Sequence, residues 1–257
     1  MKAVILAGGF GTRISEESHL RPKPMVEIGG RPILWHIMKL FGAYGITDFV
    51  ICCGYKGYCI KEYFSHYGLY HSDVTFDFRK EGRVEIHHSQ TEPWRITLAD
   101  TGYATMTGGR IRKVAPYLEG ERFFLTYGDG VADVNLEQLL AYHQEKGKKA
   151  TMTVVQPEGR FGVTELENGC VKRFREKAKE DGGWINGGFF VLEPDIFPYL
   201  DGADTVWEQE PLERLAQEGE LAAYAHHGFW QCMDTVRDRQ KLEELWKVGA
   251  PWKVWSE

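Results

Sequence analysis

Glycines and two cations near the N-terminus are spaced as in a loop that binds phosphate. Leu6-Ala7-Gly8-Gly9-Phe10-Gly11-Thr12-Arg13 follows a short apolar run, and Arg21-Pro22-Lys23-Pro24-Met25 follows a polar stretch. Glycine has no Cβ, so backbone N–H groups can close on phosphate oxygens. Arg13 and Lys23 can then close over the same anion. The segment therefore predicts a polyphosphate-binding site.

Two common nucleotide-binding patterns do not fit this loop. The dinucleotide fingerprint, counted from Gly9 and Gly11, needs glycine or alanine where this chain has Ile14. The Walker A pattern needs Gly-Lys followed by Ser or Thr, and neither glycine is followed by lysine. A Rossmann dehydrogenase, which would bind NAD, is therefore disfavoured.

A carboxylate later in the chain suits a metal ion beside such a phosphate. Asp129 follows an apolar run and lies between Gly128 and Gly130. Mg²⁺ commonly takes one or two protein carboxylates together with substrate phosphates. By itself the motif favours an aspartate in a turn after a strand. Together with the glycine loop it favours a metal ligand.

These residues follow predicted strands of an α/β domain. The first half alternates strand and helix patterns, which predicts a parallel sheet covered by helices, with a nucleotide site at the carboxyl ends of its strands. Predicted strands cover 2–7, 48–53, 122–127, 151–156, 185–192 and 221–225, with shorter runs at 74–78, 84–88 and 96–99. A hairpin of 160–167 and 170–175 is expected around Asn168-Gly169. Predicted helices cover 32–44, 58–67, 109–118, 136–146, 208–217 and 236–248.

Composition excludes several other classes of protein. The 257 residues carry a formal charge of −6, so no general affinity for nucleic acid or membranes is implied. No stretch approaches the roughly 20 apolar residues of a membrane span. The five cysteines are odd in number and show no zinc spacing, so we expect a reduced cytoplasmic protein.

The loop Leu-x-Gly-Gly-x-Gly-Thr-Arg, followed by Lys-Pro, resembles the signature of the sugar-nucleotide pyrophosphorylases. Four further stretches are similar to the glucose-1-phosphate cytidylyltransferases in particular: Trp35-His36-Ile37-Met38-Lys39, Cys53-Gly54-Tyr55-Lys56-Gly57-Tyr58, Glu92-Pro93-Trp94 and Trp207-Glu208-Gln209-Glu210-Pro211-Leu212. This resemblance runs from residue 1 to about residue 255. It implies a Rossmann-like nucleotidyltransferase fold, whose mixed, mainly parallel sheet is sandwiched by helices beside a smaller β-rich, sugar-binding part.

The resemblance also implies a reaction. CTP and α-D-glucose 1-phosphate would give CDP-glucose and pyrophosphate by Mg²⁺-dependent, in-line displacement at the α-phosphate, in a homo-oligomer with nucleotide contacts between subunits. Two alternatives stay open. The loop reads phosphates and not bases, so UTP or dTTP could replace CTP. A non-catalytic, nucleotide-sensing homologue is the other, against which Arg13, Lys23, Asp129 and Asp234 together argue.

Residue roles follow from the resemblance. Arg13, Lys23, Asp129 and Asp234 are the expected catalytic residues, and the two aspartates are the expected metal ligands; Asp234 equally suits the N-cap of the closing helix. The expected nucleotide-binding residues are Leu6, Ala7, Gly8, Gly9, Gly11, Thr12, Arg13, Lys23, Thr105, Arg110 and Gly128.

The sugar phosphate is expected to bind in the second half of the chain, at Gly162, Glu176, Lys177 and Asn186. Read alone, Glu176-Lys177 is ordinary surface charge, and Ala178 replaces a proline usual in the family, which leaves this loop less rigid. We expect one domain over 1–257, with a mainly nucleotide-binding half (about 1–150) and a mainly sugar-phosphate-binding half with the closing helix (about 151–257).

Overall fold

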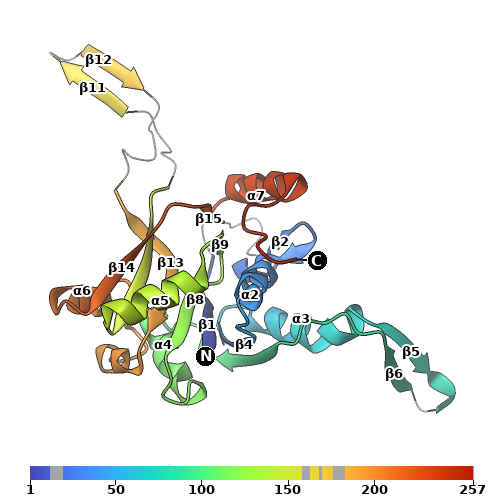
Figure 1. Cartoon of the computed structure of the whole chain (residues 1–257). Helices are drawn as coiled ribbons and strands as arrows, with labels where there is room; N and C mark the ends of the chain where they lie inside the picture. The colour runs from blue at the N-terminus through green and yellow to red at the C-terminus, as the bar shows by residue number, and fades with distance from the viewer. Residues whose placement is uncertain (12–19, 81, 158–162, 168–169, 176–182, 257) are drawn as a thin grey trace.

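A seven-stranded mixed sheet forms the centre of the molecule in the computed structural model, which describes residues 1–11, 20–80, 82–157, 163–167, 170–175 and 183–256 (Figure 1). In spatial order its strands are β14 (Leu221–His226), β10 (Ala150–Val155), β13 (Ile185–Leu192), β8 (Phe123–Tyr127), β1 (Lys2–Ala7), β4 (Asp48–Cys53) and β7 (Arg95–Asp100). Strand β13 runs antiparallel to both of its neighbours, whereas the other paired strands are parallel. The predicted mixed, mainly parallel sheet is confirmed.

Helices cover both faces of this sheet. They are α2 (Ile33–Ala43), α3 (Gly57–Tyr70), α4 (Thr107–Val114), α5 (Leu136–Lys146), α6 (Glu210–Gln217) and α7 (Val236–Val248). One core cluster packs α2, α3, α5 and α7 against the sheet, and the other packs α4 and α6. Strand β1 is buried along its whole length, as expected for a parallel strand covered on both faces. No helix in the described part of the chain is long and apolar enough to cross a membrane.

Short strand pairs complete the described fold. They are β2 (Glu27–Ile28) with β3 (Arg31–Pro32), β5 (Asp73–Asp77) with β6 (Arg83–His87), β9 (Gly130–Ala132) with β15 (Trp230–Cys232), and β11 (Val163–Glu167) with β12 (Cys170–Arg175). Single turns of 3-10 helix lie at Lys23–Met25, Phe78–Lys80 and Ala115–Tyr117, and a longer one at Pro194–Tyr199. The hairpins β5–β6 and β11–β12 project from the body (Figure 1).

Two helix boundaries differ from the sequence prediction in ways that matter for the site. Helix α4 begins at Thr107 instead of residue 109, and α6 begins at Glu210 instead of residue 208. Pro211 lies in the first turn of α6, where its missing N–H costs no hydrogen bond. Glu208 therefore precedes the helix.

Candidate active site

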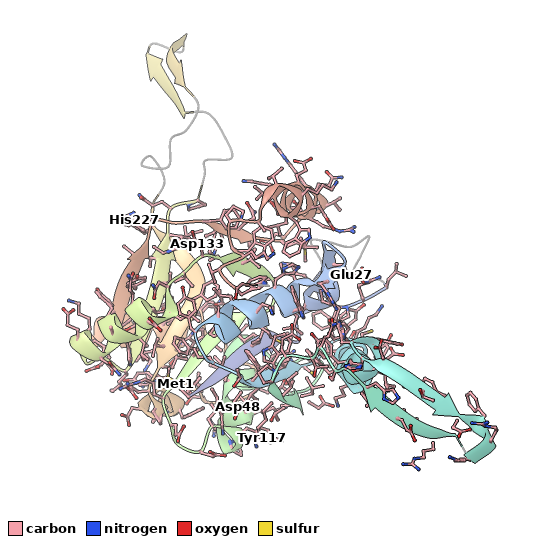
Figure 2. All side chains as sticks on the ribbon, turned by 45° about the vertical axis from the view of Figure 1, so that its right-hand side comes forward. Met1, Glu27, Asp48, Tyr117, Asp133 and His227 are labelled. Atoms are coloured by element: carbon pink, nitrogen blue, oxygen red, sulfur yellow. The ribbon has the colours of Figure 1, made fainter. Side chains whose placement is uncertain are left out.

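The predicted phosphate loop lies at the carboxyl end of the parallel strands. Figure 2 shows Met1 and Asp48, which lie at the starts of β1 and β4, at one end of the body, and Asp133 and His227 at the other. A pocket of about 370 Å³ opens where β1 and β8 end. It is lined by every predicted nucleotide-binding residue in the described ranges: Leu6, Ala7, Gly8, Gly9, Gly11, Lys23, Thr105, Arg110 and Gly128. Asp129 and Asp234 also line it, whereas Thr12 and Arg13 lie outside the described residues.

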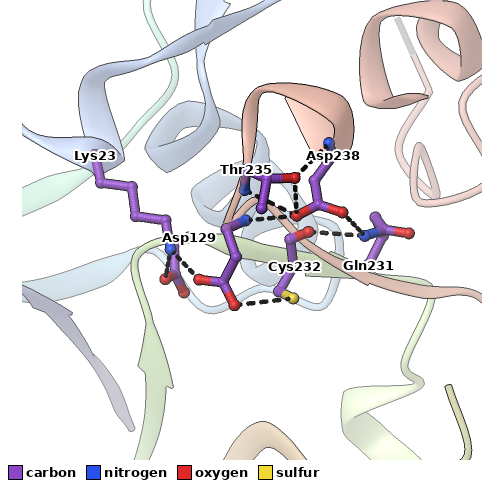
Figure 3. Close-up of polar contacts among 7 residues, drawn as sticks. Lys23, Asp129, Gln231, Cys232, Thr235 and Asp238 are labelled. Carbon is purple, nitrogen blue, oxygen red and sulfur yellow. Dashed lines mark hydrogen bonds and ion pairs between the residues drawn. The ribbon is translucent and has the colours of Figure 1, made fainter. Parts of the chain in front are cut away.

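Lys23 joins the two predicted metal ligands. Its ammonium donates to Asp129 Oδ2 and to Asp234 Oδ1, both at 2.6 Å (Figure 3). The three side chains are 11%, 30% and 20% exposed, respectively. Burial by itself lowers the pKa of Lys23, but the two carboxylates outweigh it and the pKa is raised. A positive charge is therefore held where both carboxylates converge.

A small strand pair brings these distant aspartates together. Asp129 directly precedes β9, and Asp234 follows β15 after one residue. The two strands pair antiparallel, and the Met233 N–H donates to the Asp129 carbonyl at 2.8 Å. Neither β9 nor β15 is predicted from the sequence, because three residues are too few for a readable alternation.

The suggested N-cap role of Asp234 is wrong. The closing helix α7 is capped by Thr235, whose hydroxyl accepts from the Asp238 N–H, while the Asp238 carboxylate accepts from the Thr235 N–H (Figure 3). This reciprocal capping box satisfies the first turn of the helix. The Asp234 carboxylate is thereby left to face Lys23.

The donor set fits a hard divalent cation. Carboxylate oxygens are ligands that Mg²⁺ prefers, and this ion usually binds one or two of them and completes its shell with water and substrate phosphates. Within the described residues no group of three or more His, Cys, Asp or Glu side chains could hold a metal. Asp129 and Asp234 would therefore supply two oxygens, at a point that already holds a cationic group.

Arg110 is a buried side chain that bonds to the glycine loop. It is 4% exposed, and its guanidinium donates to the carbonyls of Gly8 and Gly102 and to the Thr101 hydroxyl. A Cβ on Gly8 would lie 2.2 Å from this guanidinium, so Arg110 would have to shift. A Cβ on Gly54 would also lie 2.7 Å from the Gly8 carbonyl oxygen, so that position requires glycine. The Gly8 carbonyl also accepts from the Tyr55 N–H at 3.1 Å. Nucleotide binding by Arg110 stays a prediction, alongside this observed role in positioning the loop.

A smaller pocket of about 50 Å³ adjoins Asp129 on the β13 side. Asn186, a predicted sugar contact, lines it together with Tyr127, Asp129 and Trp230. The other predicted sugar-phosphate residues, Gly162, Glu176 and Lys177, lie outside the described residues. Sequence reasoning missed Tyr127 and Trp230, although Tyr127 lies two residues before Asp129 and Trp230 four residues before Asp234.

Comparisons with known proteins point to one family. The sequence pattern of the family described as "Nucleotidyl transferase" matches residues 2–238. The glucose-1-phosphate cytidylyltransferase of Salmonella typhi is 59% identical, with all of both chains covered. The protein of Bacillus subtilis (strain 168) named "Probable glucose-1-phosphate cytidylyltransferase" is 49% identical, over 99% of this chain and 100% of that one.

A solved structure shares the fold at much lower identity. The UDP-glucose pyrophosphorylase from Acinetobacter baumanii superposes with a TM-score of 0.69 at 16% identity, covering 98% of this chain and 95% of that one. Such a likeness supports the architecture alone. With the family pattern and the full-length relatives, the chain belongs to the nucleotidyl transferase family, on the branch that holds these glucose-1-phosphate cytidylyltransferases.

Proposed function

We propose that this protein transfers the cytidylyl group of CTP to α-D-glucose 1-phosphate, giving CDP-glucose and pyrophosphate. One observation carries the chemistry: Lys23, Asp129 and Asp234 converge where a glycine-lined pocket meets a smaller one. The larger pocket suits the nucleoside triphosphate, and the smaller one would take part of the sugar phosphate. The choice of substrates rests on the 59% identical relative, which is named for this activity.

Positioning and charge neutralisation supply most of the proposed acceleration. Both reactants are anions, and the attacking phosphate monoester is already ionised near neutral pH, so no general base is needed. Backbone N–H groups of Gly8, Gly9 and Gly11 would hold the triphosphate. The Lys23 ammonium would stabilise charge at the α-phosphate, and Arg13 would cover the leaving pyrophosphate.

Nucleotidyltransferases of this family generally use a divalent metal, and we propose Mg²⁺, held by Asp129 and Asp234. When bound, the ion would neutralise charge on the phosphate oxygens and orient them. Lys23 contacts one oxygen of each carboxylate, so an ion that bound these same oxygens would displace the ammonium and leave it available for the phosphate.

The division of labour along the chain is also a proposal. Residues 1–150 would mainly bind nucleotide and 151–257 mainly sugar phosphate, within one domain whose central sheet includes strands from both halves. A homo-oligomer with nucleotide contacts between subunits, and a cytoplasmic location, stay predictions.

A panel of four nucleoside triphosphates with glucose 1-phosphate and Mg²⁺, read by pyrophosphate release, tests the proposal. We expect CTP to be preferred. A preference for UTP or dTTP would mean that the proposed base is wrong and that the proposed class of reaction is right. No release with any triphosphate would favour the non-catalytic homologue.

A further inference from the structure

Glu208 bonds to two residues that line the pockets. Its carboxylate accepts from the Tyr127 hydroxyl at 2.5 Å through Oε1 and from the Thr107 hydroxyl at 2.6 Å through Oε2. Tyr127 lines both pockets, and Thr107 lines the larger one as the first residue of α4. Glu208 has no role in the catalytic steps proposed for Lys23, Asp129 and Asp234.

The neighbouring residue fixes Glu208 in place. Trp207 is fully buried, and its ring meets Phe190 of β13 edge-on, with ring centroids 5.9 Å apart. The Trp207 N–H donates to the Thr107 hydroxyl at 2.9 Å. The short segment before α6 is therefore anchored both to the sheet and to the start of α4.

The charge of Glu208 sets the direction of a chain of hydrogen bonds. An ionised carboxylate only accepts, so the Tyr127 hydroxyl must give its hydrogen to Glu208 and can only accept from a third group. That group is Asn186, whose Nδ2 donates to the Tyr127 hydroxyl at 3.1 Å. The Asn186 Oδ1 in turn accepts from the Gly188 N–H at 2.8 Å. These two hydrogen bonds fix which way the Asn186 amide faces where it lines the smaller pocket.

The same reasoning orients Thr107 on the other side. Its hydroxyl hydrogen goes to Glu208, so its oxygen accepts from the Trp207 N–H. Helix α4 then begins in one fixed position relative to β8.

We propose that Glu208 is a positioning residue that orients Asn186 toward the sugar of the sugar phosphate, through Tyr127, and holds the start of α4 against the nucleotide pocket, through Thr107. The inference rests on the proposed function for the identity of the two substrates. It adds a residue that acts on the binding of both substrates through Tyr127 and Thr107.

Glu208→Gln is the test variant, because its amide can donate to the Tyr127 hydroxyl. Tyr127 is then no longer required to accept from Asn186, and the orientation of the Asn186 amide is no longer fixed. We expect KM for glucose 1-phosphate to rise about 10-fold, the equivalent of one charge-assisted hydrogen bond, with a smaller rise for CTP and kcat within about 3-fold of wild type. Tyr127→Phe should raise KM for glucose 1-phosphate more than KM for CTP. Glu210→Gln, two residues away on exposed surface beside Arg214, is the matched control.

Two results would overturn the proposal. One is a pair of KM values for Glu208→Gln that match those of Glu210→Gln, and the other is a fall confined to kcat. Should Glu208→Gln fail to fold, the other two variants test the proposal. Tyr127→Phe should then act mainly on KM for glucose 1-phosphate and Thr107→Val mainly on KM for CTP, and a variant pair that changed both KM values equally would also overturn it. The wild-type triphosphate panel tests the proposed function separately. If another base is preferred there, the same KM ratios are measured with that triphosphate.

Discussion

The contact of Lys23 with Asp129 and Asp234 predicts that a metal ion and this lysine compete for the same oxygens. Lys23→Met removes the ammonium and keeps most of the aliphatic stem. The variant then holds two partly buried carboxylates that face each other across the space the nitrogen filled. One oxygen of each carboxylate lies 2.6 Å from the point where the Lys23 nitrogen was. Without metal, we expect the folded state to be destabilised by their repulsion.

Two estimates of this loss agree. Two unit charges about 5 Å apart repel by about 3 kcal/mol at an effective dielectric constant of about 20. Removing one partner of a buried ion pair typically costs about 3–5 kcal/mol. A loss of about 3 kcal/mol lowers the melting temperature of a chain of this size by roughly 8 °C.

Thermal unfolding in EDTA and in Mg²⁺, without nucleotide, measures the effect. We expect Mg²⁺ to restore much of the melting temperature of Lys23→Met and to change that of wild type little, because Lys23 already neutralises the pair. Turnover should still fall on the order of 10²–10³-fold at saturating Mg²⁺, by analogy with the loss of a donor to an oxyanion. Lys61→Met, which removes an exposed lysine from α3, is the control. Equal Mg²⁺-dependent shifts in wild type and Lys23→Met would refute the reasoning.

Three further predictions address the loop, the core and the closing helix. Gly8→Ala should raise KM for CTP at least 10-fold, since its Cβ would lie 2.2 Å from the Arg110 guanidinium; an unchanged KM would mean that the loop tolerates displacement. Burial lowers the pKa of His36 from 6.5 to about 4, so its protonation favours unfolding as pH falls below 6.5. Urea unfolding should therefore lose about 2 kcal/mol between pH 7 and pH 5, a loss that is absent from His36→Gln. Thr235→Ala should cost about 1 kcal/mol in the same assay by breaking the capping box with Asp238, and a neutral result would show that the box adds no stability.

Local patterns predicted most elements and the glycine loop. The strand at 48–53 and the helices at 136–146 and 236–248 have the predicted bounds. Apolar periodicity and turn residues encode such segments within a few neighbours along the chain. Predicted boundaries failed where a distant partner decides them. At Thr107, for example, the hydroxyl bonds to Trp207 and Glu208, a hundred residues away.

The sequence by itself determined that a strand is followed by a phosphate loop and that the fold is α/β. It also determined that a lysine motif, at Lys23, and an aspartate motif, at Asp129, accompany the loop. Only the tertiary structure decided that Lys23 lies between Asp129 and Asp234, and that Thr235, not Asp234, caps α7. It also decided that Glu208 bonds to two residues that line the pockets. The physical reason is that these contacts depend on how the ends of β8, β9 and β15 meet at one edge of the sheet, and no local pattern records that pairing.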